Sequence, residues 1–290
     1  MSKGTLDRPS LAGMKILVED VIRADDDAKI MRISDRERPG TAYALKVVNR
    51  EGPADDARLA RCRAAAEASA KLGHAAILKY HDYRARRDWF RVARGELLME
   101  YVKGKDLADL AGRPDVDQWI LIFKHVAGAL AHMQRRGVLH GDLAPGRVLL
   151  GNAGAVKVIG YGQSLVENTD HRTITKQFAA PELQKEKMIT ERTDIYAMGT
   201  FMYFLLTGKT PNALRGRGDD EAVKVPRPSA LNPKVPPALD EVILPCVQRN
   251  PQRRPEGMYD VYKGLDDLAG TLDLDDGRLA GLAAGRVEQE

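Results

Sequence analysis

The hydrophobic pattern changes period near Gly104, and this change most constrains what the chain can fold into. Before that point the apolar residues form short, strand-like runs, interrupted by one Ala-rich helical segment at residues 57–72. The strand-like runs cover residues 16–18, 28–33, 42–48, 89–92 and 96–101. After Gly104 the apolar residues recur at helical spacing, first in a long stretch from Trp119 to Met133 that ends at Gly137. The sequence therefore predicts an α+β protein with a small β-rich lobe containing one main helix, followed by a larger helical lobe.

The same pattern sets the expected boundaries of these parts. Residues 1–13 form an N-terminal extension, residues 14–102 the strand-rich lobe and residues 103–268 the helical lobe. Residues 269–290 consist of Gly, Ala and charged residues with little apolar periodicity. We expect this last segment to be a loosely held C-terminal tail.

Composition excludes several classes of protein. The chain has 290 residues, of which 43% are hydrophobic, so it can bury a full core. Its 45 Lys and Arg residues against 41 Asp and Glu residues are too balanced to indicate nucleic acid or an anionic membrane as a partner. The longest apolar run, residues 198–206, is too short to span a bilayer. The two distant cysteines, Cys62 and Cys246, fit a reducing compartment, so we expect a cytoplasmic protein.

One stretch, His140 to Gly162, begins with an HGDL sequence and ends with a Gly-Tyr-Gly, which follows an apolar strand and starts about a dozen residues after Arg147. Five further segments lie elsewhere along the chain: Tyr43–Val48, Leu97–Val102, Ala179–Glu182, Asp194–Gly199 and Arg253–Pro255. These six segments, in this order, resemble the motifs of the eukaryotic-type Ser/Thr protein kinase domain, and the resemblance covers roughly residues 14–268. It implies a bilobal kinase fold and protein partners in signalling.

The resemblance also assigns roles to individual residues. Lys46 takes the place of the phosphate-binding lysine, and Asp142 that of the catalytic base, which is either functional or vestigial. An apolar slot for an adenine ring is implied by Ala44, Met99, Glu100, Val102 and Leu149. Because adenine contacts and phosphate contacts are separate, a purine pocket could persist without phosphate binding.

Both metal ligands of the family are replaced. Arg147 stands where the family has Asn, and Gly160 stands where it has Asp. A guanidinium cannot coordinate a cation and glycine has no side chain, so we expect no metal site and no Mg²⁺. Arg147 has two possible roles, an internal salt bridge to Asp142 or a contact to a nucleotide phosphate, and the salt bridge is the favoured interpretation.

Phosphate handling is altered elsewhere too. The Gly-rich loop of the family falls on residues 24–31, which contain no glycine and three carboxylates at positions 25–27. Each carboxylate would oppose a phosphate charge by roughly 2 to 3 kcal/mol. We interpret the run as an acidic, solvated turn, with a metal-collecting cluster as the alternative. The helix glutamate that pairs with Lys46 in the family falls on Ala65, and Glu67 could replace it only if the register shifts locally.

These losses favour a pseudokinase, a regulatory or binding module with weak or no phosphotransfer that binds ATP weakly at most. The alternative is an atypical Ser/Thr kinase that uses Lys46, Asp142 and Arg147 in a metal-poor site. A third hypothesis is a pure scaffold whose nucleotide slot is filled by side chains. The sequence names neither partner nor substrate, nor does it give the oligomeric state.

Overall fold

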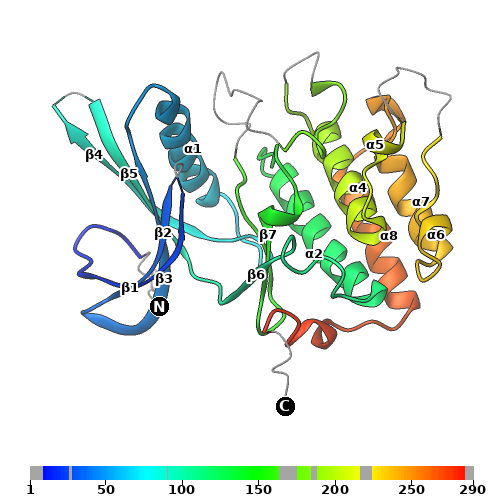
Figure 1. Ribbon diagram of the computed structural model, residues 1–290, viewed down its shortest axis with the longest axis horizontal. Helices are drawn as coiled ribbons and strands as arrows, with labels where there is room; N and C mark the ends of the chain where they lie inside the picture. Colours follow the sequence, from blue (N-terminus) through cyan, green and yellow to red (C-terminus); the bar gives the residue numbers. More distant parts are fainter. Residues whose placement is uncertain are drawn as a thin grey trace, which may run out of the picture. The chain divides into compact units, whose positions relative to one another are not determined.

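The computed structural model describes residues 9–25, 28–89, 91–162, 175–183, 188–215 and 224–284. The chain divides into two compact units (Figure 1). The first contains residues up to 73 together with 78–101, and the second contains residues 74–77 and most of the chain from residue 102 onwards. The predicted fold class, α+β with a small β-rich part that contains one main helix and a larger helical part, is confirmed.

The first unit is built on one antiparallel sheet. Its strands are, in spatial order, β1 (Ile16–Ala24), β2 (Lys29–Asp35), β3 (Arg38–Asn49), β5 (Arg91–Glu100) and β4 (Tyr80–Asp88). The sequence placed a separate strand at residues 89–92, which is wrong because Trp89 lies in the turn between β4 and β5. The strand-like runs do not include β4, because most of its residues are polar or charged and form no apolar run.

A single helix, α1 (Ala54–Ser69), packs against β3, β4 and β5, as Figure 1 shows. It begins and ends slightly earlier than the predicted segment at residues 57–72. Its small buried side chains, including Ala64, Ala65 and Ala68, let the helix approach the sheet closely.

The opposite face of the sheet carries the main core of the first unit. It consists of Leu11, Met31, Ile33, Leu45, Val47 and Leu98. Leu11 belongs to the segment predicted to be an N-terminal extension, yet it is only 1% exposed. Asp82 Oδ2 holds this segment by accepting hydrogen bonds from Ser10 Oγ and from the backbone N–H of Leu11, both at 2.8 Å. Residues 10 and 11 are therefore part of the folded unit.

The second unit combines a small sheet with helices. The sheet contains β6 (Gly104–Asp106), β7 (Val148–Gly151) and β8 (Val156–Val158). The helices are α2 (Val116–Gln134), α4 (Glu191–Thr207), α5 (Pro211–Arg215), α6 (Pro228–Leu231), α7 (Pro237–Cys246) and α8 (Met258–Thr271). α2 contacts α4 and α8 and buries most of its apolar residues there. It is the long helix that the sequence predicts from Trp119 to Met133.

Two helices are bounded by side chains that satisfy free backbone groups. Asp115 and Gln118 form a reciprocal capping box at the start of α2, and Thr190 and Thr193 form one at the start of α4. α4 ends at Gly208, whose φ of 70° is strained for residues with a Cβ. Both ends of α4 are thus fixed, and α4 carries Asp194 in its first turn.

The C-terminal segment differs from its prediction as a loosely held tail. α8 continues to Thr271, and a short 3₁₀ helix, η5 (Asp276–Leu279), follows it. Leu279 is fully buried, and the backbone N–H of Gly281 donates to the carbonyl of Asn152 in the β7–β8 turn at 2.9 Å. A few apolar side chains and backbone hydrogen bonds hold residues 276–284, and such contacts leave no periodic signal.

Among the described residues, no helix has the combination of length and apolar character that crossing a bilayer requires.

Candidate functional site

Asp142, at the position implied for the catalytic base, has both carboxylate oxygens engaged. Its side chain is fully buried, and Oδ2 accepts hydrogen bonds from Nε (3.1 Å) and Nη2 (2.8 Å) of Arg147. Oδ1 accepts a hydrogen bond from the backbone N–H of Thr175 at 2.8 Å. Arg147 reaches Asp142 from the 3₁₀ turn η1 (Pro145–Arg147), which leads into β7. The internal salt bridge, the favoured interpretation of Arg147, is present in the structure.

The side chain of Arg147 also lies over Gly160. Gly160 follows β8 with a φ of 77°, and a Cβ placed on it would lie 3.1 Å from Cδ and 3.5 Å from Nε of Arg147. The neighbouring backbone N–H of Ile159 donates to the carbonyl of Arg147 at 2.9 Å, which holds the two segments together. A side chain at position 160 would therefore need both a left-handed backbone and a displaced arginine.

A buried frame beneath Asp142 fixes the loop that carries it. The backbone N–H groups of His140 and Gly141 donate to the two carboxylate oxygens of Asp194, each at 2.8 Å. Nδ1 of His140 accepts from the backbone N–H of Asp142 at 3.2 Å, so Nε2 carries the ring proton and donates to the carbonyl of Ile159 at 3.0 Å. His140 thus packs as a neutral core residue.

The pKa values of this frame reflect its burial. Loss of hydration lowers the pKa of His140 to about 4, and the nearby Asp142 carboxylate only partly offsets this effect. Loss of hydration likewise raises the pKa of Asp194 to about 6, against the two backbone N–H groups that favour its charged form. A histidine held neutral in this way is a structural group rather than an acid or base poised near neutral pH.

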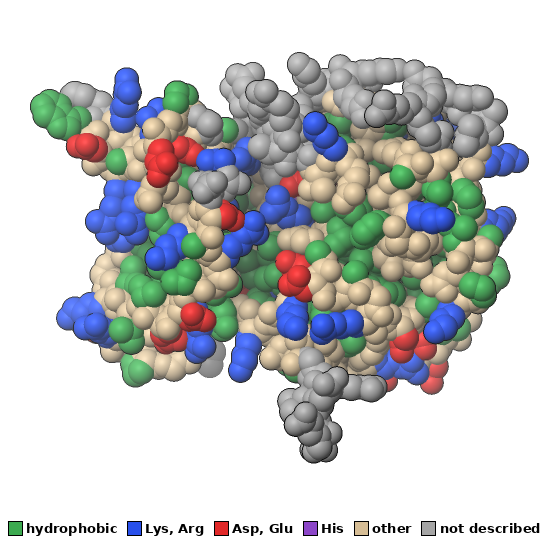
Figure 2. Space-filling view, viewed as in Figure 1, with side chains coloured by type: hydrophobic (Ala, Val, Ile, Leu, Met, Phe, Trp, Pro, Cys, Tyr) green, Lys and Arg blue, Asp and Glu red, His purple; other side chains and the backbone are tan. Residues whose placement is uncertain are grey.

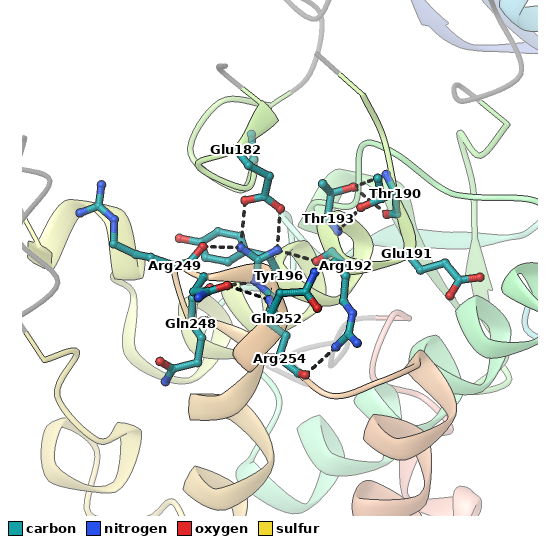
Figure 3. A network of polar contacts seen from close by, with 12 residues as sticks. Glu182, Thr190, Glu191, Arg192, Thr193, Tyr196, Gln248, Arg249, Gln252 and Arg254 are labelled. Atoms are coloured by element: carbon teal, nitrogen blue, oxygen red, sulfur yellow. Dashed lines mark hydrogen bonds and ion pairs between the residues drawn. The ribbon is translucent and has the colours of Figure 1, made fainter. Parts of the chain in front are cut away.

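A second arginine–carboxylate pair joins Glu182 to Arg254, which follows the short 3₁₀ helix η4 (Pro251–Arg253) and precedes α8 (Figure 3). Arg254, fully buried, donates from Nη1 (2.6 Å) and Nη2 (2.9 Å) to the two oxygens of Glu182. Its other donors reach the carbonyls of Gln248, Arg249 and Arg192, and its guanidinium lies 4.8 Å from the ring centroid of Tyr196. All N–H donors of this guanidinium make hydrogen bonds, and such full pairing makes a buried charge tolerable.

In the first unit, the pairing of Lys46 on β3 differs from the ion pair with a helix glutamate that is usual in the kinase family. Glu67, the possible replacement partner, instead pairs with Arg63 at 2.8 Å on the exposed side of α1. Ala65 is buried, as expected for the position facing the sheet. In the described part of the chain no carboxylate lies within ion-pair distance of the Lys46 ammonium. The register shift that would bring Glu67 to Lys46 is therefore not seen.

The turn between β1 and β2 occupies the place of the Gly-rich loop. Asp25 closes it, because its backbone N–H donates to the carbonyl of Ala28 at 3.2 Å and its Oδ1 accepts from the backbone N–H of Ala28 at 2.9 Å. Its Oδ2 pairs with Nε of Arg23 at 2.6 Å. Asp25 thus stabilises a turn, in agreement with the interpretation of an acidic turn. Positions 26 and 27 lie outside the described residues.

The residues implied for an adenine slot are distributed over both units. Ala44 and Met99 are direct cross-strand partners on β3 and β5, and both are buried. Glu100 ends β5, where its backbone N–H donates to the carbonyl of Lys79 at 2.8 Å. Val102 and Leu149 belong to the second unit, where Leu149 is half-buried on β7. The structure brings the first pair together, and the role of all five as nucleotide contacts stays a prediction.

The donor set at positions 147 and 160 does not suit the Mg²⁺ that the kinase family uses. One position presents a guanidinium and the other presents no side chain, so neither supplies the oxygen ligand that Mg²⁺ requires. The carboxylate of Asp142 is already paired with that guanidinium. A cation bound there would be repelled by the positive charge of Arg147, so the residues present do not fit this metal.

Two contacts at this site were not predicted from the sequence. They are the hydrogen bond from Thr175 to Asp142 and the packing of Arg147 over Gly160. The sequence did carry a signal for the second contact, because both motif positions are replaced together. The long side chain of Arg147 can occupy the space that a side chain at position 160 would fill.

The five-stranded sheet with its single helix, and a helical unit that carries Asp142 on a loop anchored by Asp194, define a protein of the kinase class. Residues 28–262 match the family model described as the protein kinase domain, so the chain belongs to that family.

Similar proteins include bacterial kinases. The chain is 29% identical over 250 residues to the serine/threonine-protein kinase PknL of Mycobacterium tuberculosis, which covers 81% of this chain and 61% of PknL. It is 25% identical over 242 residues to the serine/threonine-protein kinase PrkC of Bacillus subtilis, which covers 79% of this chain and 36% of PrkC. The chain thus spans only about a third to three fifths of the length of such relatives.

Among solved structures, the crystal structure of the M. tuberculosis PknI kinase domain superposes with a TM-score of 0.66 and 26% identity. The match covers 88% of this chain and 96% of the PknI chain.

Proposed function

We propose that this chain is a pseudokinase, a kinase-fold module that acts in signalling by binding protein partners and has weak or no phosphotransfer. The observation that carries the proposal is the position of Arg147, which pairs with Asp142 and lies over Gly160. A substrate hydroxyl would have to displace either Arg147 or the Thr175 N–H to reach Asp142. Phosphoryl transfer also depends on metal to neutralise phosphate charge, so its loss slows transfer by roughly a thousandfold.

Nucleotide binding is expected to be weak for the same reasons. Lys46 still supplies a positive charge for phosphate. Asp25 closes the β1–β2 turn, at the position of the family's Gly-rich loop, and supplies a negative charge that opposes phosphate binding. Ala44 and Met99 still offer a buried apolar surface that suits an adenine ring. We therefore propose that any ATP bound is held mainly through its base, without Mg²⁺. Both cysteines are free and buried, which fits a module that works in the cytoplasm.

The test is a phosphotransfer assay with generic protein substrates in Mg²⁺ or Mn²⁺. The expected result is that incorporation of phosphate by the natural chain does not exceed that of the Asp142→Asn variant. Robust turnover that Asp142→Asn abolishes would overturn the proposal, because it would show that Asp142 still acts as a base.

A second candidate, an atypical Ser/Thr kinase using Lys46, Asp142 and Arg147, is favoured by one observation: PknL and PrkC carry the name serine/threonine-protein kinase. A thermal-shift titration with ATP, with and without metal, separates the candidates. No shift under either condition counts against the atypical kinase, whereas a large shift without metal supports it and assigns Arg147 to the phosphates.

A further inference from the structure

The β4–β5 hairpin of the first unit carries a row of arginines on one face. Cross-strand pairing places Arg84 opposite Glu96 and Arg86 opposite Arg94, so these four side chains share the face that bears Leu98 of the core. Beyond Arg86 the register shifts, and Arg87 pairs with Val92. In the space-filling view, Lys and Arg side chains gather over this end of the sheet (Figure 2).

One buried carboxylate organises three of these arginines. Glu96 is 2% exposed, and its oxygens lie 2.6 Å from Nη2 of Arg84, 3.0 Å from Nη2 of Arg94 and 3.3 Å from Nε of Arg86. Arg84 is fixed further by donating to the carbonyl of Leu11 at 3.1 Å. A single negative charge therefore orients three positive ones, and the face keeps a net positive charge. Nε of Arg94 is buried and has no hydrogen-bond partner in the described structure.

The tip of the hairpin adds an exposed aromatic residue. Trp89 is 89% exposed and adopts a φ of 53°, a left-handed conformation that is uncommon for residues other than glycine. The other tryptophan, Trp119, is 3% exposed in α2, as is usual for a residue of this size. Protection of an edge strand against self-association accounts for the arginines of β4, but it does not account for a tryptophan held in solvent.

We propose that the outer face of the β4–β5 hairpin, formed by Arg84, Arg86 and Arg94 with Trp89 at its tip, binds an extended acidic segment of a partner protein. In an extended chain, alternate residues lie about 6.6 Å apart on one face, which matches the spacing of Arg84 and Arg86 along β4. Oriented guanidinium groups bind carboxylates in defined geometry, and Trp and Arg are the residues that most often dominate protein interfaces. This surface does not depend on whether the chain transfers phosphate.

The distribution of charge favours a peptide over a membrane surface. The arginines follow the length of the hairpin from its tip to the Leu11 contact, whereas a lipid surface would select cations gathered around the tip alone. An acidic segment with carboxylates on alternate residues can contact the whole row. Its last residue, if apolar, would lie against Trp89.

The probe is a fluorescein-labelled peptide of alternating Glu and Thr residues ending in Leu, with a Gln-for-Glu peptide as its neutral counterpart. We expect the natural chain to bind the acidic peptide, to lose affinity as salt is added, and to shift the Trp89 emission to shorter wavelength. The Arg86→Gln and Trp89→Ala variants should each weaken binding by about tenfold. The Arg36→Gln variant, which removes an exposed arginine from the β2–β3 turn, should bind like the natural chain.

Circular dichroism and the urea midpoint verify that each variant is folded. Arg84 and Arg94 are left unchanged because they neutralise the buried Glu96. The proposal is overturned if the natural chain binds both peptides equally or neither of them. It is also overturned if Arg36→Gln weakens binding as much as the hairpin variants do. Binding to vesicles containing phosphatidylglycerol without binding to the acidic peptide would assign the hairpin to a membrane surface instead.

Discussion

Two arginine–carboxylate pairs in the second unit have opposite settings. Arg254 is fully buried and spends all its donors on Glu182 and three carbonyls, so it joins segments that are far apart in sequence. Arg147 is 38% exposed and places two donors on one oxygen of the buried Asp142. The first pair holds the family fold together, whereas the second occupies a position where the family performs chemistry. The comparison teaches that this chain keeps the buried supports of the kinase fold, while Asp142, at the position implied for the catalytic base, is held in an ion pair with Arg147.

The largest expected effect is on the structural pair. Arg254→Ala should lower the free energy of unfolding by about 3–5 kcal/mol, because Glu182 and several carbonyls lose their partner inside the protein. Urea denaturation followed by circular dichroism measures this change.

The matched control is Arg278→Ala, which breaks an ion pair with Asp117 whose two side chains are 44% and 42% exposed. It should cost less than about 1 kcal/mol. Equal losses for the two variants would contradict the distinction between a buried structural pair and a surface pair.

A smaller effect tests the contact between Arg147 and Gly160. Gly160→Ala should cost about 2 kcal/mol in the natural chain, through the left-handed backbone and the close approach to Cδ of Arg147. In an Arg147→Ala background only the backbone cost should remain, so the double-mutant cycle should give a coupling of about 1 kcal/mol. A coupling of zero would show that Arg147 does not occupy the space over Gly160.

The smallest expected effect concerns pH. The pKa of His140 is lowered to about 4 in the folded state, so the unfolded state binds more protons between pH 4 and about 6.5 and stability falls as pH falls through that window. Asp194 acts in the opposite sense, because its pKa is raised to about 6 and the folded state gains protons on acidification. Replacing His140 by Gln should therefore remove an acid-induced loss on the order of 1–2 kcal/mol between pH 7 and pH 5.

Urea denaturation of both proteins at the two pH values measures this difference. A parallel loss of stability in the natural chain and in His140→Gln would show that His140 is not the group that takes up the proton.

Much of this structure is predictable because it follows from local patterns of apolar residues and from motif residues. The change of period at Gly104 predicts the two parts, and α2 follows the apolar spacing from Trp119 onwards. The replaced motif residues also identify Arg147 as a partner of Asp142. β4 is not predictable in this way, because its charged residues become a strand through pairing with β5. The burial of Leu11 and Leu279 is not predictable either. Each of these residues is buried by segments distant in sequence, and a single apolar residue does not indicate such contacts.

The central claim, that the metal positions now hold a resident cation, is tested most directly by measuring ATP affinity with Mg²⁺ and with EDTA by calorimetry. The Arg147→Asn/Gly160→Asp variant, which restores both family ligands, serves as the comparison. The account predicts that Mg²⁺ leaves the affinity of the natural chain for ATP unchanged. Tightening by about tenfold or more on addition of Mg²⁺ to the natural chain would contradict it.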